Sequence, residues 1–247
     1  MMENEVLLIA VGALAGGFVN GLAGFGTALF ALGFFLQALP PTQAVALSVV
    51  MSVFNGIPGL WVVRHSALKY PRRSLRFLLP AIIGIPMGTA ALGVVDPYLL
   101  QLLIAGFMML YGTFFLMRGS LPQFDRSTPV ADGLVGFAGG LMGGLAGLSG
   151  ALPAMWCALR PWPRHETRAV LQPFSVVILL ITGGVLAWRG AYTSDMLPGM
   201  IVGVGVAGVS AQLGIFVFKR LSDTAFRWVL VGLMLVSGTV LMIRTLV

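Results

Sequence analysis

Two glycine clusters are the part of this sequence best suited to bind an anion. The first spans Gly21–Gly26 and precedes Thr27, and the second spans Gly144–Gly150. Each glycine weakens a helix by about 1 kcal/mol relative to alanine, so we expect a helix to break at each cluster and a new one to start at Thr27 and at Gly150. The free N–H groups and positive dipole end of such a start bind anions without a charged side chain. The candidate binding residues of the two breaks are Gly24, Phe25, Gly26, Thr27, Gly147, Leu148, Ser149 and Gly150.

Polar side chains within the apolar runs form a second group of candidates: Asn20, Ser52, Asn55, Gln172, Ser175 and Gln212. Asn55 lies shortly before Pro58, and Gln172 directly precedes Pro173. Both amides therefore lie where proline disturbs the backbone hydrogen bonding of a helix. A buried amide at such a place can donate to the oxygens of an anion. The competing interpretation is that these side chains bond across helices or satisfy the carbonyls that the prolines leave free.

Arg64 and Arg189 are candidates for attracting an anion into a vestibule on either side of the membrane. They occupy corresponding places 125 residues apart, and each lies close after a tryptophan, Trp61 or Trp188. If the two halves of the chain are inverted copies, as argued below, one arginine lies at each membrane face. The alternative, which we favour, is that Trp and Arg at a helix end are interfacial anchors.

The sequence lacks the groups that an enzyme or a metal site would need. His65 and His165 fall in predicted loops and Cys157 is the only cysteine, so we predict no nucleophile–base pair and no metal cluster in the membrane. The run Gly203–Gly208 matches a dinucleotide fingerprint but lacks the preceding strand that the fingerprint requires. All eight acidic residues lie at the termini or in predicted loops, which argues against a proton relay. We therefore predict no enzymatic activity and no cofactor.

The composition identifies lipid as the main solvent of this protein. Of the 247 residues, 58% are hydrophobic and 9% are charged, where a soluble chain has about 25% charged residues. The net charge of +7 does not indicate nucleic-acid binding, because the basic residues flank apolar runs. A spanning helix needs about 20 apolar residues. Six uncharged runs approach or exceed that length: Thr42–Val63, Phe77–Val95, Pro97–Met117, Ala169–Trp188, Met196–Phe218 and Trp228–Ile243.

Two further apolar runs, Val6–Gln37 and Gly133–Leu159, are too long for one helix and too short for two, and each contains a glycine cluster. If each is a re-entrant hairpin of two half-helices, 13 of the 15 basic residues lie on one side, and only Arg189 and Arg244 lie on the other. If every segment crosses fully, the split is 9 to 6. Since Lys and Arg accumulate on the cytoplasmic side, we predict six crossings and two hairpins, with both termini outside.

The two halves of the chain repeat, since Gly16–Gly24 and Gly139–Gly147 are identical at six of nine positions. Each half holds a hairpin and three crossings, an odd number, so the second half is predicted to be inverted relative to the first. We predict an all-α polytopic membrane protein with repeats at 1–120 and 133–247, joined by a linker loop at 121–132. Inverted repeats with broken helices are typical of secondary transporters, whose substrate binds at the breaks. This favours a binding site over the alternative that the glycines only allow close helix packing.

The glycine patterns of both halves resemble those of the TauE/SafE sulfite exporter family, also called the toluene sulfonate uptake permeases. The most specific parts are Gly16-Gly17-x3-Gly21-x2-Gly24-x-Gly26 and Gly140-x2-Gly143-Gly144-x2-Gly147-x2-Gly150-x2-Pro153. The resemblance extends from about Ala10 to Ile243 and implies transport of sulfite, a sulfonate or another small organosulfur anion. The chain departs from the family pattern after Gly26, where Thr27 and Ala28 follow and no proline comes before Pro40.

Together these observations predict a secondary transporter that exports a small organosulfur anion bound near the midplane between the two breaks. The absence of mid-membrane carboxylates and of an ATP-binding motif favours transport driven largely by the membrane potential, which is worth about 2.3 kcal/mol per charge and 100 mV. The alternatives are an anion channel and an importer of a sulfonate or carboxylate-like anion. The expected partners are the anion and the lipid bilayer, and a homodimer is compatible with so small a carrier. The expected location is a bacterial-type inner (plasma) membrane.

Overall fold

The computed structural model of the chain describes residues 3–67, 71–117, 124, 127–162 and 164–247. Within these residues the chain is helical and contains no β-strand. The helices are α1 (Glu3–Ala23), α2 (Thr27–Ala38), α3 (Pro41–Ala67), α4 (Pro71–Leu92), α5 (Pro97–Met117), α6 (Pro129–Ala146), α7 (Ala151–Ala158), α8 (Arg164–Trp188), the short 3₁₀-helix η2 (Ser194–Met196), α9 (Leu197–Arg220) and α10 (Asp223–Leu246).

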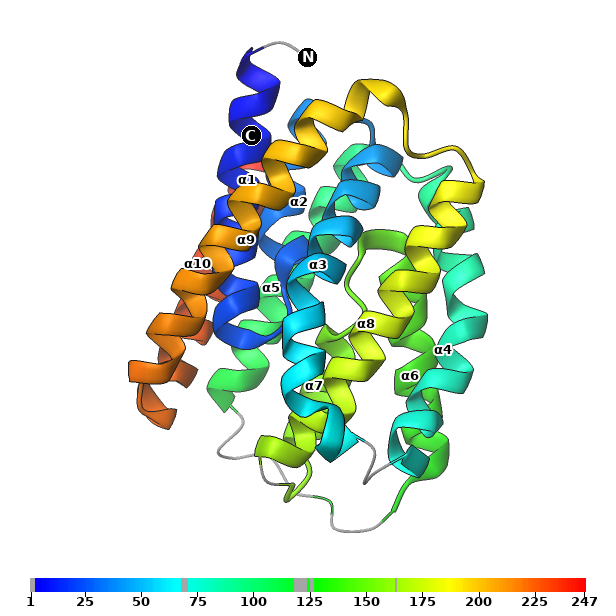
Figure 1. Cartoon of the computed structure of the whole chain (residues 1–247), viewed down its shortest axis with the longest axis vertical. Coiled ribbons are helices and arrows are strands. Elements are labelled where there is room, and N and C mark those ends of the chain that lie inside the picture. Colours follow the sequence, from blue (N-terminus) through cyan, green and yellow to red (C-terminus); the bar gives the residue numbers. More distant parts are fainter. Residues whose placement is uncertain (1–2, 68–70, 118–123, 125–126, 163) are drawn as a thin grey trace.

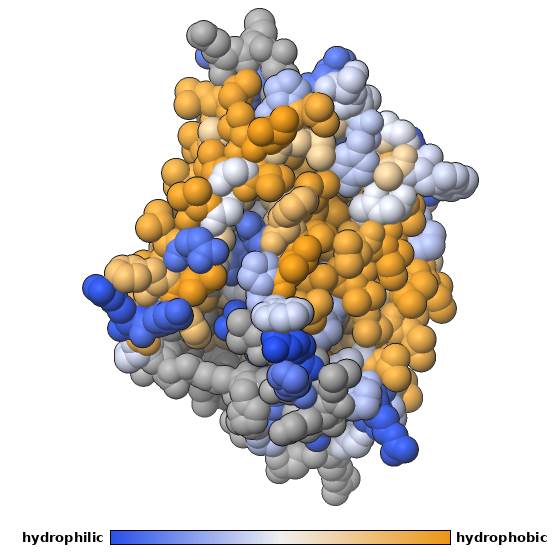
Figure 2. All heavy atoms as spheres, viewed as in Figure 1, coloured by the Kyte–Doolittle hydropathy of each residue, from blue (hydrophilic) through white to orange (hydrophobic). Residues whose placement is uncertain are grey.

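Eight of the described helices are long and apolar enough to cross a membrane, judged by length and composition: α1, α3, α4, α5, α6, α8, α9 and α10. The prediction of an all-helical polytopic membrane protein is confirmed at this level, and all six predicted crossing segments are helices. Large apolar side chains such as Leu7, Ile83 and Val209 are more than 60% exposed on the outer surface. Figure 2 shows apolar residues over most of one face of the molecule, as expected for a surface that contacts lipid.

The two glycine clusters break the chain between α1 and α2 and between α6 and α7. Gly24, Gly26 and Gly147 have φ angles of +81°, +101° and +69°, which side chains other than glycine rarely adopt. Helix α2 begins at Thr27, as predicted, and α7 begins one residue after the predicted Gly150. The segments are unequal, with 21 and 12 residues at the first break and 18 and 8 at the second, and the re-entrant hairpins stay a prediction.

In Figure 1, α1 descends from the upper end of the molecule and α2 returns toward it, whereas α6 rises from the lower end and α7 returns downward. Both chain termini lie toward the upper end of this view. The lower end gathers the basic ends of α3, α8 and α9. Of the predicted linker 121–132, residues 121–123, 125 and 126 lie outside the described residues, and Pro129–Asp132 already belong to α6.

Glycine allows two helix pairs to pack with their backbones in contact, α1 against α9 and α6 against α4. A methyl group on Gly21 would lie 2.0 Å from the carbonyl oxygen of Ala211, and one on Gly140 would lie 2.1 Å from that of Ala81. No side chain fits at these distances, so each pair depends on its glycines. The long helices α3 and α8 also contact each other, as do α5 and α10.

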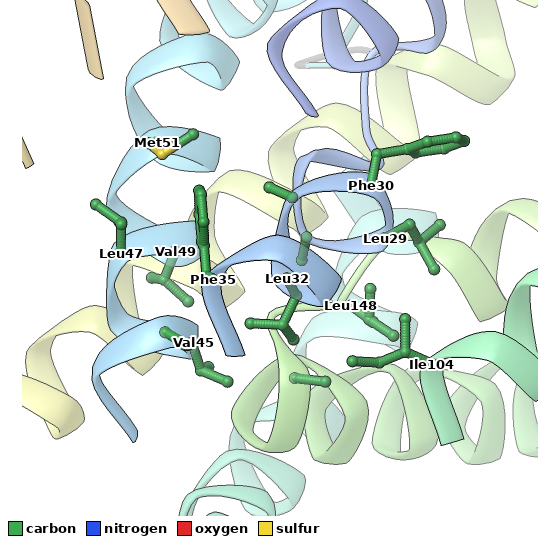
Figure 3. Close-up of a cluster of buried hydrophobic side chains, with 14 of the residues drawn as sticks. Leu29, Phe30, Leu32, Phe35, Val45, Leu47, Val49, Met51, Ile104 and Leu148 are labelled. Carbon is green, nitrogen blue, oxygen red and sulfur yellow. The ribbon is translucent and has the colours of Figure 1, made fainter. Parts of the chain in front are cut away.

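Helix α2 is enclosed by the rest of the protein, with nine of its twelve residues buried. Figure 3 shows Leu29, Leu32 and Phe35 of α2 beside residues of α3, with Ile104 of α5 and Leu148 of the second break nearby. These side chains belong to the main hydrophobic core, in which Leu32 and Phe35 are fully buried. A twelve-residue helix in this position is too short to span the hydrocarbon layer and does not need to face it.

Candidate functional site

The two helix breaks meet at a small cavity of about 30 Å³. Its lining comes from both breaks and from the middle of α3 and α8. Ten of the twelve predicted binding residues lie here: Asn20, Gly24, Phe25, Gly26, Gly147, Leu148, Ser149, Gly150, Gln172 and Ser175. Residues 121 or more positions apart in the sequence are thus brought together at one place, at the two breaks and on the neighbouring part of α8.

Thr27 and Asn55, the other two predicted binding residues, do not line this cavity. Thr27 is 1% exposed, and its hydroxyl accepts a hydrogen bond of 2.8 Å from Asn20 Nδ2, which holds the first turn of α2 against the end of α1. The Nδ2 atom of Asn55 is buried without a hydrogen-bond partner among the described residues. The two residues therefore flank the cavity, and Thr27 acts on it through Asn20.

Gln172 and Ser175 of α8 lie against the two breaks. The Nε2 atom of Gln172 donates to the carbonyl oxygen of Gly56 at 3.0 Å, so this part of the amide bonds across to α3, as the competing interpretation expected. Its Oε1 points toward the first break, since a methyl group on Gly24 would lie 3.3 Å from it. At the second break a methyl group on Gly150 would lie 2.4 Å from Ser175 Oγ. The amide and the hydroxyl of α8 therefore each reach one break.

A larger cavity of about 450 Å³ lies next to the first and shares Gly24, Phe25, Gly150, Gln172 and Ser175 with it. Its other lining residues come mainly from the lower ends of α5, α7, α8, α9 and α10 in Figure 1. Figure 2 shows a hollow in this face between α9 and α3, with hydrophilic residues inside it. The paired breaks are thus approached from the lower, basic end, while the buried α2 fills the space above them.

The described lining residues of the two cavities include two arginines, Arg160 and Arg168, and no acidic residue. Arg160 is compensated, because its Nη2 donates to Asp132 Oδ1 at 3.0 Å. From the sequence both arginines indicated only the topology, and neither was predicted to lie in the site. The spacing of Arg168, Gln172 and Ser175 at i, i+4 and i+7 along one helix is the signal that would have found Arg168.

Arg64 and Arg189, the two vestibule candidates, line neither cavity. The exposed guanidinium of Arg64 lies 4.0 Å from the centre of the Trp61 ring and donates to the carbonyl oxygen of Trp61. Arg189 donates to the carbonyl oxygen of Thr89 at 2.8 Å. These contacts are those of helix-end anchors, the interpretation favoured from the sequence, and the vestibule role stays a prediction.

Asp132 corrects the expectation that all acidic residues lie at termini or in loops. It lies in the first turn of α6, is 4% exposed, and accepts from Trp156 Nε1 at 2.8 Å as well as from Arg160. The histidines were also misplaced, since His65 lies in the last turn of α3 and His165 in the first turn of α8. Among the described residues no group of His, Cys, Asp or Glu is arranged to hold a metal ion.

Comparison with known proteins identifies the family of this chain. The family model described as "Sulfite exporter TauE/SafE" matches residues 8–241, which is nearly the whole chain. No curated protein and no solved structure matches the chain.

Proposed function

We propose that this chain, which belongs to the sulfite exporter TauE/SafE family, carries a small organosulfur anion across the membrane and binds it between its two helix breaks. Family membership makes the chain a multi-pass membrane transporter and not an enzyme. The observation that carries the proposed site is the meeting of both breaks at one cavity beside Gln172 and Ser175.

The groups around this cavity suit an oxyanion. The starts of α2 and α7 direct unpaired backbone N–H groups toward the region of the breaks, and the dipole of each helix adds partial positive charge there. Gln172, Ser175 and Asn20 add side-chain amides and a hydroxyl. Sulfite and sulfonates present several oxygens that accept hydrogen bonds, so donors arriving from two opposite breaks can hold one anion on two sides.

The larger cavity favours an organosulfonate over sulfite. An ion as small as sulfite would fill only a minor part of about 450 Å³. The walls away from the breaks are mainly apolar and aromatic, with Tyr111, Phe115, Trp162 and Phe218 among them. Such walls bind the organic part of an amphiphilic anion, while the polar groups near the breaks hold its sulfonate.

The helix contacts support the proposed inverted repeat. If α1 and α2 correspond to α6 and α7, and α3, α4 and α5 to α8, α9 and α10, then the pair α1–α9 corresponds to α6–α4. The pairs α3–α8 and α5–α10 each correspond to themselves. All four pairs are in contact, as a two-fold axis in the membrane plane requires. In this arrangement α1–α2 and α6–α7 are re-entrant hairpins that enter from opposite sides.

The larger cavity lies on one side of the breaks and the buried α2 on the other, an arrangement that favours a carrier over a channel. In the proposed alternating-access cycle, the larger cavity is the open vestibule and the buried α2 is the closed gate. The basic end would be cytoplasmic, with both termini outside and a bacterial-type inner membrane as the location. A channel would show neither saturation nor counterflow, so a counterflow assay in vesicles distinguishes the two.

Anion binding to the purified protein tests this function. We expect sulfoacetate, sulfolactate or taurine to raise the thermal unfolding temperature, and matched carboxylates to do so less. Thr27→Val removes the acceptor of the Asn20 amide, and Ser149→Ala removes a hydroxyl from the cavity lining. Each change should weaken binding roughly 2- to 10-fold, the worth of one net hydrogen bond. Equal affinity of both variants and the unchanged protein would argue against a site at the breaks.

The driving force is a separate prediction. No carboxylate among the described residues lines either cavity, so we propose that the membrane potential drives export with little ion coupling. In vesicles loaded with a sulfonate of one negative charge, an inside-negative potential of about 100 mV should shift the equilibrium gradient by roughly 50-fold. Replacing sodium or collapsing the pH gradient should leave the rate unchanged. A loss of transport under either condition would show that a cation is coupled.

A further inference from the structure

Arg168 brings a guanidinium to the junction of the two cavities. The residue lies in the second turn of α8, one helical turn before Gln172 and two before Ser175. A methyl group added to Gly24 would lie 3.7 Å from Arg168 Nη2 and 3.3 Å from Gln172 Oε1. The guanidinium therefore faces the same point of the first break as the Gln172 amide, from the side of the larger cavity.

The other described arginines in this region are paired. Arg160 and Arg76 both approach Asp132, at 3.0 and 3.8 Å, and Arg73 forms an ion pair with Glu166. Arg168 forms no hydrogen bond and no ion pair with any residue that the structure describes, and its Nε atom is buried without a partner. Among the described residues its guanidinium makes a cation–π contact with Phe218, with the guanidinium carbon 5.9 Å from the centre of the ring.

Arg168 is half-buried and its Nε fully so, and an uncompensated charge there costs the ligand-free protein some stability. Burying a charge is unfavourable unless it is paired, and the penalty is recovered only when an opposite charge arrives. The lining residues that the structure describes include no acidic side chain for this purpose. An anion that enters the cavity meets the guanidinium beside the first break, where the planar fork can donate to two oxygens of one ligand.

We propose that Arg168 supplies the positive charge that neutralises the transported anion and so determines the charge specificity of the site. The inference rests on the proposed function, because it requires the anion to bind at the breaks. Arg168 holds the charged group of the substrate, Gln172 and Ser175 orient it, and the apolar walls of the larger cavity take the organic part. A neutral analogue lacks this interaction and should not bind.

Isothermal titration of the purified full chain with sulfoacetate and with sulfite tests the role of Arg168. We expect Arg168→Gln to weaken binding roughly 30-fold or more, as the loss of a buried charge partner does. Arg168→Lys keeps the charge without the planar fork, so it should recover part of the affinity. The control is Arg220→Gln, at the same end of the molecule, where an exposed arginine lies over Phe216 at 4.1 Å. This variant should bind like the unchanged protein.

A second measurement separates a binding role from a structural one. If Arg168 is an unpaired charge, Arg168→Gln should unfold at the same or a higher temperature than the unchanged protein without ligand, and the anion should no longer raise that temperature. Lower stability of Arg168→Gln with retained anion affinity would overturn the inference and leave the proposed function intact. Absence of anion binding to the unchanged protein would overturn both.

Discussion

Replacing Gly24 by alanine is expected to weaken anion binding roughly 5- to 30-fold. Gly24 has φ +81°, and a side chain in this left-handed conformation costs about 1–2 kcal/mol. The variant either bears this strain or relieves it by rotating the backbone at the break. The added methyl group would lie 3.3 Å from Gln172 Oε1 and 3.7 Å from Arg168 Nη2. The strained or rotated backbone and the added methyl group both change the first break at the point that Arg168 and Gln172 face. Titration with sulfoacetate and uptake into vesicles measure the effect.

Gly190 provides a matched control for this substitution. It also has a positive φ, +72°, but a methyl group there would have no neighbour within 4 Å, and the residue lies just after α8 at the opposite end from the larger cavity. Gly190→Ala therefore carries the same backbone penalty without touching the site. We expect similar losses of stability from both variants and a loss of transport from Gly24→Ala alone. Equal transport by the two variants would show that the geometry of the first break does not matter.

The position of the breaks could be predicted, but the length of the helices before them could not. Glycine weakens an isolated helix at every position, so the sequence offered no way to choose among the glycines of each cluster. In the structure Gly21 and Gly144 remain helical and pack directly against the backbones of α9 and α4. Only Gly24, Gly26 and Gly147 adopt positive φ angles at the breaks. Tertiary packing thus continues α1 and α6 into the glycine clusters, as far as Ala23 and Ala146.

Most residues of the candidate site could be predicted because they lie within the glycine clusters or close to a proline in the sequence. Arg168 was missed for a different reason. The predicted span began at Ala169, so Arg168 was assigned to a basic loop, whereas α8 begins at Arg164. Once the helix includes Arg168, its alignment with Gln172 and Ser175 follows from helical periodicity. The lack of a charge partner, in contrast, depends on which side chains the fold brings near, and no local pattern reports it.

Asp132→Ala is expected to destabilise the protein by about 3–5 kcal/mol, the usual cost of removing one partner of a buried ion pair. The side chains of Asp132 and Arg160 are 6% and 4% exposed, so Arg160 would keep a buried charge without its main counter-ion. Trp156 Nε1 would lose its acceptor as well. For a chain of this size the loss corresponds to a fall of roughly 6–20 °C in unfolding temperature. Thermal unfolding of the purified protein in detergent measures it.

The double variant Asp132→Ala/Arg160→Met decides whether the charge itself carries this effect. Removing both charges leaves no unpaired ion, and buried ion pairs can often be replaced by apolar groups at little cost. We expect the double variant to recover much of the stability lost in Asp132→Ala, short of the share due to Trp156. Because Asp132 ties the start of α6 to the end of α7, recovery would show that the second break is held by charge compensation. The single variant Arg160→Met completes the comparison. If its loss of stability and that of Asp132→Ala simply add in the double variant, the contacts of each side chain matter separately, and the second break is held by packing.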